Sequence, residues 1–255
     1  MIRLNQLLTQ KSLCSRRQAD VWIQNNWVFV DGVVCNTLGS KVDPHSQIRI
    51  SPLAQQEKAQ EKTILLYKPF DYVSGPTAEN YPIVHSLITL ENYFNLSDSK
   101  NKLIKPSSPP PSSQFLKMAQ DPRQLSVAGR LDIDSSGLMV LTQNGVIARQ
   151  LIDPIHPVDK EYVVKFRGQL SEKHMNEFRR GLMLDGIKLR PIEIRKTQAQ
   201  EVLMVLREGK KRQIRRMFEH FDLEVSFLKR IRIGRIKLGP LPLGQWRFLS
   251  NHEKF

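Results

Sequence analysis

Cysteine is nearly absent from this 255-residue chain, which contains only Cys14 and Cys35. Two cysteines are too few for the disulfide framework of a small secreted domain, so we expect a reduced, cytoplasmic protein. Long apolar runs are missing too, because no stretch reaches the ~18 apolar residues of a membrane span. The N-terminal stretch lacks the apolar core and cleavage site of a signal peptide. These absences predict that no segment crosses a membrane.

Motifs for metal or cofactor chemistry are also lacking. The six histidines show no metal-ligand spacing with one another or with the cysteines. The chain contains no Gly-rich phosphate loop, no dinucleotide fingerprint and no serine–histidine elbow. A glycosidase pair would need a second acid facing the first across several ångströms. We therefore expect any reaction site to use a single carboxylate, with no metal and no cofactor.

Positive charge, in contrast, is abundant. Lys and Arg number 39 against 25 Asp and Glu, which gives a net charge of +14 and a pI of about 9.9. The segment from Val205 to Lys237 alone has eleven Lys or Arg and four Asp or Glu, a net of +7. Such an excess favours a polyanionic partner, chiefly nucleic acid or an anionic membrane surface. A merely solvated basic face remains the alternative.

Residues 1–50 predict a compact N-terminal unit. Leucines at 4, 7 and 8 have helical spacing, and "CSRRQADVWIQNNW" predicts a second helix with Ser15 as its N-cap. "VFVDGVVCN" predicts a hairpin around Asp31 and Gly32. Arg16 and Arg17 open the second helix, where exposed backbone N–H groups also favour phosphate. Two solvent-facing arginines without a partner are the alternative.

The remainder predicts a linker and a larger domain. Residues 51–62 are polar with little periodicity, so we interpret them as a linker. From residue 63 to 255 the chain is rich in strand patterns with helical patterns between them, which predicts an α+β domain with a mostly antiparallel, mixed sheet. Residues 106–113 contain only Pro and Ser, and about 91–124 predict an insertion that is at least partly disordered.

The segment "GRLDIDSSGL" places two carboxylates in a polar interruption between apolar stretches. Gly129 and Gly137 permit tight turns at its ends, and the acids are Asp132 and Asp134. A loop between core strands is a common way to present a catalytic side chain from a rigid scaffold. Both acids could instead stabilise a turn, and for Asp134, beside two serines, we favour that role.

The segment 207–221, "REGKKRQIRRMFEHF", predicts an amphipathic helix. Four apolar side chains recur at helical spacing: Ile214, Met217, Phe218 and Phe221. Periodicity directs Arg212 and Arg216 away from this stripe, toward solvent or RNA phosphate, and puts Arg215 at its edge. A partly buried arginine requires a carboxylate partner, for which Asp132 is a candidate.

The segment "KEYVVKF", residues 160–166, predicts a strand. Its alternation places Lys160, Tyr162 and Val164 on one face. Tyr162 there could stack on a nucleobase, although from spacing alone a core tyrosine is the favoured interpretation.

Together these segments resemble the bacterial ribosomal RNA pseudouridine synthases that have an N-terminal S4-like RNA-binding module. "RLNQLLTQKSLCSRRQADVWIQNNWVFVDG" resembles that module, and "LLYKPFDYVSG" resembles the family's Lys-Pro segment. "GRLDIDSSGLMVLTQNG" resembles the central motif with the catalytic aspartate, and "KEYVV" resembles the tyrosine-bearing strand. "EGKKRQIRRMFEHF" and "LKRIRIGRIKLGPLPLGQWR" resemble the late basic motif and the C-terminal pattern. The resemblance covers nearly the whole chain.

The resemblance implies a role for each matched residue. Asp132 would be the catalytic aspartate, Tyr162 would contact the target base, and Arg215 would hold Asp132 by an ion pair. Ile214 would line the pocket, and Asp134 corresponds to nothing catalytic. The residues expected to bind substrate are Arg130, Ile214, Arg212, Arg216, Lys68, Arg16 and Arg17.

The implied activity is isomerisation of a ribosomal RNA uridine to pseudouridine, with large-subunit rRNA favoured. The reaction conserves the atoms of one nucleotide, so it requires no small-molecule cosubstrate. We expect a cytoplasmic monomer whose partner is ribosomal RNA. Alternatives are an rRNA-binding assembly factor without catalysis, and an RNA-directed glycosidase that releases free uracil.

Overall fold

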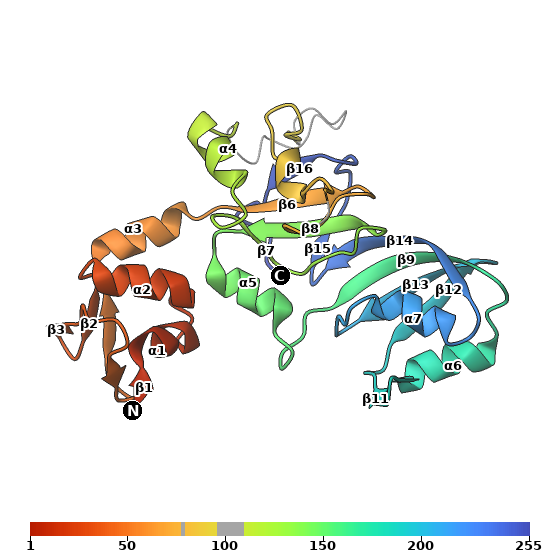
Figure 1. Ribbon diagram of the computed structural model, residues 1–255, viewed down its shortest axis with the longest axis horizontal. Helices are drawn as coiled ribbons and strands as arrows, with labels where there is room; N and C mark the ends of the chain where they lie inside the picture. Colours follow the sequence, from red (N-terminus) through yellow and green to blue (C-terminus); the bar gives the residue numbers. More distant parts are fainter. Residues whose placement is uncertain (78–79, 96–109) are drawn as a thin grey trace. The chain divides into compact units, whose positions relative to one another are not determined.

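The computed structural model describes residues 1–77, 80–95 and 110–255. The chain divides into two compact units (Figure 1). The first comprises Met1–Thr63 together with Thr142–Arg149, and the second comprises Ile64–Leu141 with Gln150–Phe255. In the part of the chain that is described, no helix combines the length and apolarity that a membrane crossing requires.

The first unit contains two helices packed on small sheets. Helix α1 spans Leu4–Gln10 and α2 spans Arg16–Gln24, and the Ser15 hydroxyl caps α2 by accepting from the backbone N–H of Gln18 at 3.2 Å. The strands are β1 Ile2–Arg3, β2 Val28–Val30, β3 Val33–Val34, β4 Lys41–Val42 and β5 Ile48–Ile50. β1 pairs with β4, and the other sheet has the order β3-β2-β5.

The predicted helices and hairpin of this unit are confirmed. Trp22 and Ile23 are buried with Leu4 and Leu8 in one core. Asp31 and Gly32 have positive φ angles of 50° and 86°, as a tight hairpin turn requires. The capping pattern and the apolar spacing were therefore sufficient to locate these elements.

The interpretation of residues 51–62 as a linker is wrong, because Pro52–Gln60 forms helix α3. Ser51 caps this helix by accepting from the backbone N–H of Ala54 at 3.2 Å, and Ala54 is fully buried in the core of the first unit. The Glu57 carboxylate accepts a hydrogen bond from Trp22 Nε1 at 3.2 Å. One small residue and one carboxylate make these contacts, so the segment shows no apolar stripe in its sequence.

A long mixed sheet forms the second unit, with the strand order β12-β13-β9-β14-β8-β6-β16. Its strands are β6 Thr63–Lys68, β8 Ser136–Thr142, β9 Lys160–Arg167, β12 Glu193–Gln198, β13 Glu201–Leu206, β14 Glu224–Ile233 and β16 Trp246–Phe248. Short strands β7 Ser126–Val127 and β15 Ile236–Lys237 pair with β8 and β14. β9 pairs antiparallel with β13 and β14, whereas β14 runs parallel to β8. The predicted α+β class with a mixed sheet is confirmed.

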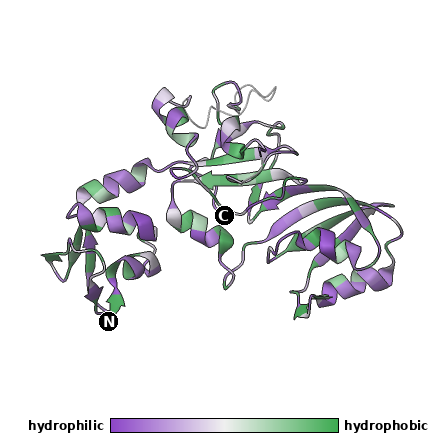
Figure 2. Ribbon diagram, viewed as in Figure 1, coloured by the Kyte–Doolittle hydropathy of each residue, from purple (hydrophilic) through white to green (hydrophobic). Residues whose placement is uncertain are grey.

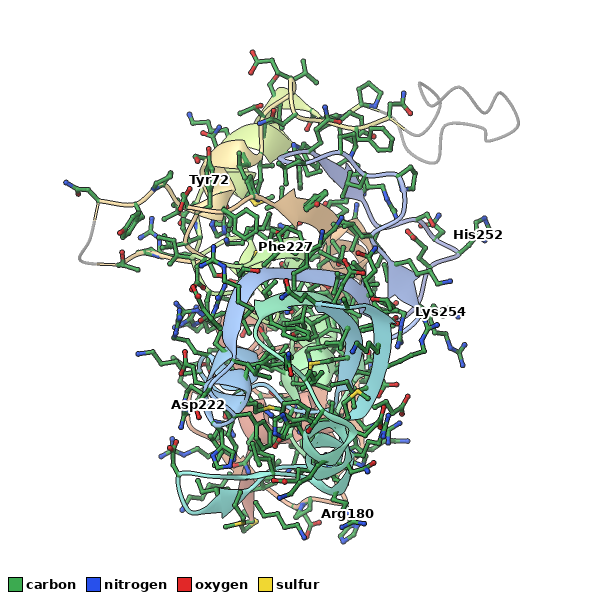
Figure 3. All side chains as sticks on the ribbon, turned by 90° about the vertical axis from the view of Figure 1, so that its right-hand side faces the viewer. Tyr72, Arg180, Asp222, Phe227, His252 and Lys254 are labelled. Carbon is green, nitrogen blue, oxygen red and sulfur yellow. The ribbon has the colours of Figure 1, made fainter. Side chains whose placement is uncertain are left out.

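Helices and a hairpin flank this sheet. They are the 3-10 helix η1 Val84–Leu87, then α4 Ser113–Ala119, α6 Glu172–Arg180 and α7 Gln213–Glu219, whereas most of helix α5 Gly145–Ile152 belongs to the first unit. Strands β10 Met183–Leu184 and β11 Ile187–Lys188 pair with each other. All seven residues of β8 are buried, and Figure 2 colours the strand as largely hydrophobic. Arg180, labelled in Figure 3, ends α6 and is exposed.

The last part of the expected insertion over residues 91–124 is ordered. Residues 113–119 form α4, whose buried Ala119 and half-buried Phe115 pack against the main core. The Phe115 ring lies 5.0 Å from that of Phe248 and 6.0 Å from that of Trp246, between ring centroids. Residues 96–109, including the first half of the Pro/Ser segment 106–113, lie outside the described residues.

Candidate active site

The loop between β7 and β8, residues 128–135, carries Asp132 and Asp134 and is fixed by side chains from distant parts of the chain. One support is Arg230 on β14, which is 1% exposed. Its Nε donates to the carbonyl of Leu138 at 2.7 Å and its Nη2 to the carbonyl of Gly129 at 2.9 Å. A guanidinium presents several donors in a fixed geometry, so this one residue ties the carbonyl of Gly129, near the start of the loop, to the strand that follows the loop.

A second support is Lys68, at the end of β6. Its Nζ donates to the carbonyls of Ser135 at 2.7 Å, Pro69 at 2.8 Å and Ile133 at 3.4 Å. Lys68 is completely buried, and burial lowers its pKa from 10.5 to about 8, against the opposing effect of nearby carboxylates, chiefly Asp134. The prediction that Lys68 binds substrate is therefore wrong, because its side chain has no surface that a substrate could reach. Lys68 instead stabilises the loop from within the protein.

Backbone and hydroxyl groups hold the middle of the loop. The Ser74 hydroxyl donates to the carbonyl of Leu131 at 2.6 Å and accepts from its N–H at 3.1 Å. The N–H of Asp71 donates to the carbonyl of Ile133 at 3.0 Å, and the N–H of Ser135 to that of Asp132 at 3.1 Å. These hydrogen bonds hold the backbone of the loop in one conformation before any substrate binds.

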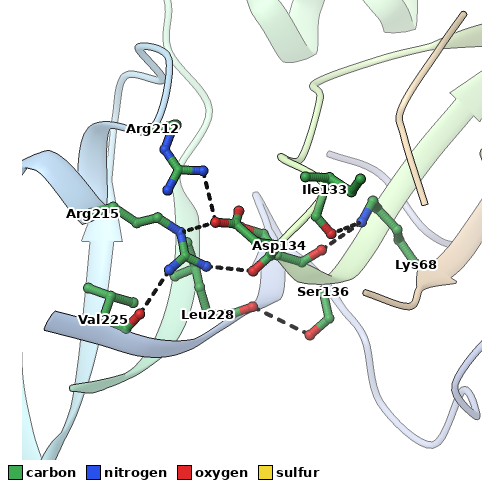
Figure 4. A network of polar contacts seen from close by, with 9 residues as sticks. Lys68, Ile133, Asp134, Ser136, Arg212, Arg215, Val225 and Leu228 are labelled. Carbon is green, nitrogen blue, oxygen red and sulfur yellow. Dashed lines mark hydrogen bonds and ion pairs between the residues drawn. The ribbon is translucent and has the colours of Figure 1, made fainter. Parts of the chain in front are cut away.

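Arg215 on α7 binds Asp134 and not Asp132, so the predicted ion pair is wrong in its acid. Its Nε lies 3.0 Å from Oδ2 of Asp134, and its Nη2 donates to the Asp134 carbonyl at 2.5 Å (Figure 4). Its Nη1 donates to the carbonyl of Val225 at 2.8 Å. Arg215 is 8% exposed, as its position at the edge of the apolar stripe predicted. Asp134 is consequently an anchor of the loop, a role that the turn interpretation missed.

Arg212 also joins this cluster. Its Nη1 donates to Oδ2 of Asp134 at 2.8 Å, and this hydrogen bond is the main cause of the raised pKa of Arg212. Arg212 precedes α7 in the left-handed conformation, with φ of 51°, so helical periodicity does not govern the direction of its side chain. Its side chain is expected to face solvent or phosphate and remains half-exposed, but it also pairs with Asp134. Arg216, likewise expected to face outward, forms an ion pair with Asp185 in the β10–β11 turn.

Asp132 differs from its neighbours because its carboxylate is left without a partner. It is half-buried, and among the described residues its side-chain oxygens take part in no hydrogen bond or ion pair. The loop thus presents one unengaged carboxylate from a backbone fixed by Arg230, Lys68 and Arg215. Arg130, two residues before it, is exposed.

The predicted strand and helix beside the loop are confirmed. Tyr162 on β9 is 8% exposed, shares a buried face with Val164, and pairs across the sheet with Arg230. Ile214 is 5% exposed and belongs to the same core as Tyr162. The contact of Tyr162 with a base, and of Ile214 with a pocket, stay predictions.

The close approach of β8 to β14 requires glycine at position 137. Gly137 has a φ of +117°, and a Cβ there would lie 2.3 Å from the backbone oxygen of Arg230. Sequence reasoning missed Arg230 itself, since register shifts in β14 beside it obscure the alternation that would mark a buried position. Within the described ranges, no three His, Cys, Asp or Glu side chains converge as metal ligands would.

Comparison with known proteins agrees with this architecture. Residues 62–220 match the family model of RNA pseudouridylate synthase, and residues 2–48 match that of the S4 domain. Over 99% of its length the chain is 30% identical to the ribosomal large subunit pseudouridine synthase B of Bacillus subtilis (strain 168), of which it covers 94%. It is 29% identical to the dual-specificity RNA pseudouridine synthase RluF of Escherichia coli (strain K12), over 99% of this chain and 77% of that protein.

A solved structure has the same fold. A crystal structure of a pseudouridylate synthase superposes with a TM-score of 0.63 at 22% identity, covering 98% of this chain and 96% of that one.

Proposed function

We propose, from the premise that the chain belongs to the RNA pseudouridylate synthase family, that it converts a particular uridine of ribosomal RNA to pseudouridine. The relative from Bacillus subtilis, named for the large ribosomal subunit, favours large-subunit rRNA as the substrate. The S4 domain match supports binding to RNA through the first unit.

The reaction itself places modest demands on the protein. The N1–C1′ bond of the uridine breaks, the uracil turns, and a C5–C1′ bond forms, after which the C5 proton is lost and N1 gains one. All atoms of the nucleotide are retained, so a cosubstrate is unnecessary. One carboxylate suffices, as a nucleophile on the nucleotide or as a base that removes a proton from it.

The observation that carries the proposal is the contrast between the fixed loop and its one unengaged carboxylate. Three buried or nearly buried cations, Lys68, Arg215 and Arg230, hold the carbonyls around Asp132. Asp132 alone is available to meet a nucleotide, since Asp134 is occupied by two arginines. Because Asp132 is held in position before substrate binds, little free energy is spent on reorganising the site when it reacts.

The surrounding residues suit a flipped uridine. The nucleotide leaves the RNA stack to reach Asp132, and Tyr162 stacks on the base while Ile214 lines the pocket. Arg130, an exposed residue of the same loop, binds a neighbouring phosphate. Arg16 and Arg17 of the first unit bind the RNA backbone and fix its register. We further propose a cytoplasmic monomer that acts on RNA alone.

The decisive test is Asp132→Asn, which removes the reacting charge and keeps the shape of the side chain. We expect pseudouridine formation in rRNA to be abolished while the affinity for RNA stays within a few-fold, because different residues bind phosphate. Asp71→Asn is the matched control, since Asp71 is an exposed acid near the same loop whose backbone conformation asparagine also adopts. Each variant is incubated with rRNA from a strain that lacks the protein, and the pseudouridine formed is then mapped chemically.

Each outcome discriminates between functions. Full activity in Asp132→Asn would remove this residue from the reaction. A wild-type chain that binds rRNA without forming pseudouridine would instead support the assembly-factor alternative, and release of free uracil would support a glycosidase.

A further inference from the structure

The first unit contains a pocket that the catalytic site does not use. It has a volume of about 280 Å³ and is lined by Gln6, Thr9, Gln10, Arg16 and Arg149. The lining therefore includes two guanidinium groups and two amides but no carboxylate. Side chains of this kind all donate hydrogen bonds, and the pair of positive charges is uncompensated, so the pocket suits an anion.

Arg149, in the last turn of α5, lines this pocket and is held there by a contact with α1. Its Nη1 donates to the backbone carbonyl of Thr9 at 2.9 Å, which holds the guanidinium and leaves its other N–H groups for a ligand. Arg16, at the start of α2, makes no hydrogen bond or ion pair with any residue that the structure describes. Both side chains are exposed, so a ligand can reach them from solvent.

The start of α5 is packed tightly against the residue that caps α2. A Cβ at Gly145 would lie 2.2 Å from the Cβ of Ser15, the residue that caps α2. Asn144 caps α5 by accepting from the N–H groups of Val146 and Ile147 at 3.0 Å. Its amide donates to Glu61 at 2.5 Å, after the end of α3. These contacts fix Arg149 beside the N-terminus of α2.

We propose that this pocket binds one phosphate of the RNA backbone between Arg16 and Arg149. The inference rests on the proposed function, because it takes RNA as the partner. It adds α5, which follows the strand after the catalytic loop, to the RNA-binding surface of the S4 module. A phosphodiester accepts the several N–H donors that the two arginines present, and it offsets their mutual repulsion.

The experiment is a double-mutant cycle on the full chain, with Arg16→Gln, Arg149→Gln and the double variant. The affinity for ribosomal RNA, taken from a strain that lacks the protein, is measured at several salt concentrations. Each single variant is expected to bind about tenfold more weakly, the loss of one charge-assisted contact. The double variant is expected to bind about as weakly as either single one, because both arginines hold the same phosphate.

Two further variants make the test specific. Arg195→Gln removes the same charge from an exposed position on β12 and is expected to change affinity little. Gly145→Ala removes no charge but pushes α5 from α2, so it is expected to weaken binding as Arg149→Gln does, with thermal unfolding as the check on folding. The proposal would be overturned if the losses of affinity multiply in the double variant. It would also be overturned if the losses in the single variants do not exceed that of Arg195→Gln.

Binding and turnover are measured separately, so the two proposals can fail independently. If the variants show the expected loss of affinity but the wild-type protein forms no pseudouridine, the proposed function is overturned and the phosphate pocket is retained. Pseudouridine formation with multiplicative losses would overturn the pocket alone.

Discussion

Two arginine-rich helix starts, at α2 and at α7, use the same residue type for opposite purposes. At α2, Arg16 and Arg17 are exposed, and neither forms an ion pair with any described residue. At α7, Arg212 and Arg215 share the carboxylate of Asp134. The first pair keeps both charges available to a partner, whereas the second pair shares one acid of its own chain, which offsets one of its two charges.

This difference shows why total charge is a poor guide to a binding surface. The segment from Val205 to Lys237 carries half of the net positive charge of the chain. Two of its cations nevertheless point inward, since Arg215 and Arg230 are both at most 8% exposed. The attraction to a polyanion comes from unpaired, exposed cations, so it is weaker at α7 than the sequence suggests.

The largest effect is expected for Arg215→Met, which tests whether the α7 arginines act through the loop. The variant keeps the apolar stem but loses the contacts to Asp134 and Val225, so the loop shifts. We expect turnover to fall by about 10²-fold or more, since small misplacements near a reacting group cost that much. Arg215→Lys should not rescue it, because an ammonium cannot span the same acceptors.

Single-turnover kinetics at saturating rRNA, alongside affinity measurements, checks this prediction. Arg195→Met serves as the control for loss of an arginine. An Arg215→Met chain that binds rRNA poorly yet turns over normally once saturated would place Arg215 with the phosphate contacts, like the arginines of α2.

A smaller effect is expected for Lys68, in the dependence of stability on pH. Burial lowers its pKa to about 8 in the folded chain, below the ordinary value of 10.5. Between these values the unfolded chain holds more protons, so the contribution of Lys68 to stability rises with pH. Relative to Lys68→Met, the wild-type free energy of unfolding should therefore gain about 2 kcal/mol between about pH 7 and 9.5.

Urea denaturation of both proteins at the two pH values measures this difference, and other titrating groups cancel in the comparison. A gap between wild type and Lys68→Met that stays constant or shrinks with rising pH would mean that Lys68 keeps its ordinary pKa. Its buried cation would then be better compensated than the contacts described above imply.

The smallest effect is expected in the salt dependence of binding, where the two helix starts can be compared directly. Arg17→Gln should lower the slope of log Kd against log salt by about 0.7 to 0.9, the release of one counterion. Arg212→Gln should change the slope less, because Arg212 is ion-paired with Asp134, which offsets part of its charge. Titration of rRNA binding from low to high salt measures both slopes. Equal reductions would show that α7 also contacts phosphate.

Much of the fold could be predicted from local patterns. Ser15 before an apolar repeat located α2, Asp31-Gly32 located a hairpin, and alternation around Tyr162 located β9. These signals succeed because neighbouring residues alone set capping, turn geometry and amphipathic spacing.

The partners within the site could not be predicted in the same way. Periodicity correctly placed Arg215 at the edge of a buried stripe, but the choice of Asp134 over Asp132 depends on the course of the loop. That course depends in turn on Lys68 and Arg230, which are distant in sequence and carry no local signal. Helix α3 was missed because its packing uses one alanine rather than a stripe.

Because the first unit is discontinuous in sequence, it cannot be completed early during synthesis. Its last part, Thr142–Arg149, is made only after residues 64–141 of the second unit. At roughly 5–20 residues per second, a ribosome needs on the order of 4–17 seconds to travel from residue 63 to residue 149. During that interval the N-terminal helices have emerged without the residues that complete their packing around Ser15. The RNA-binding unit, although it begins the chain, is finished only when more than half of the protein exists.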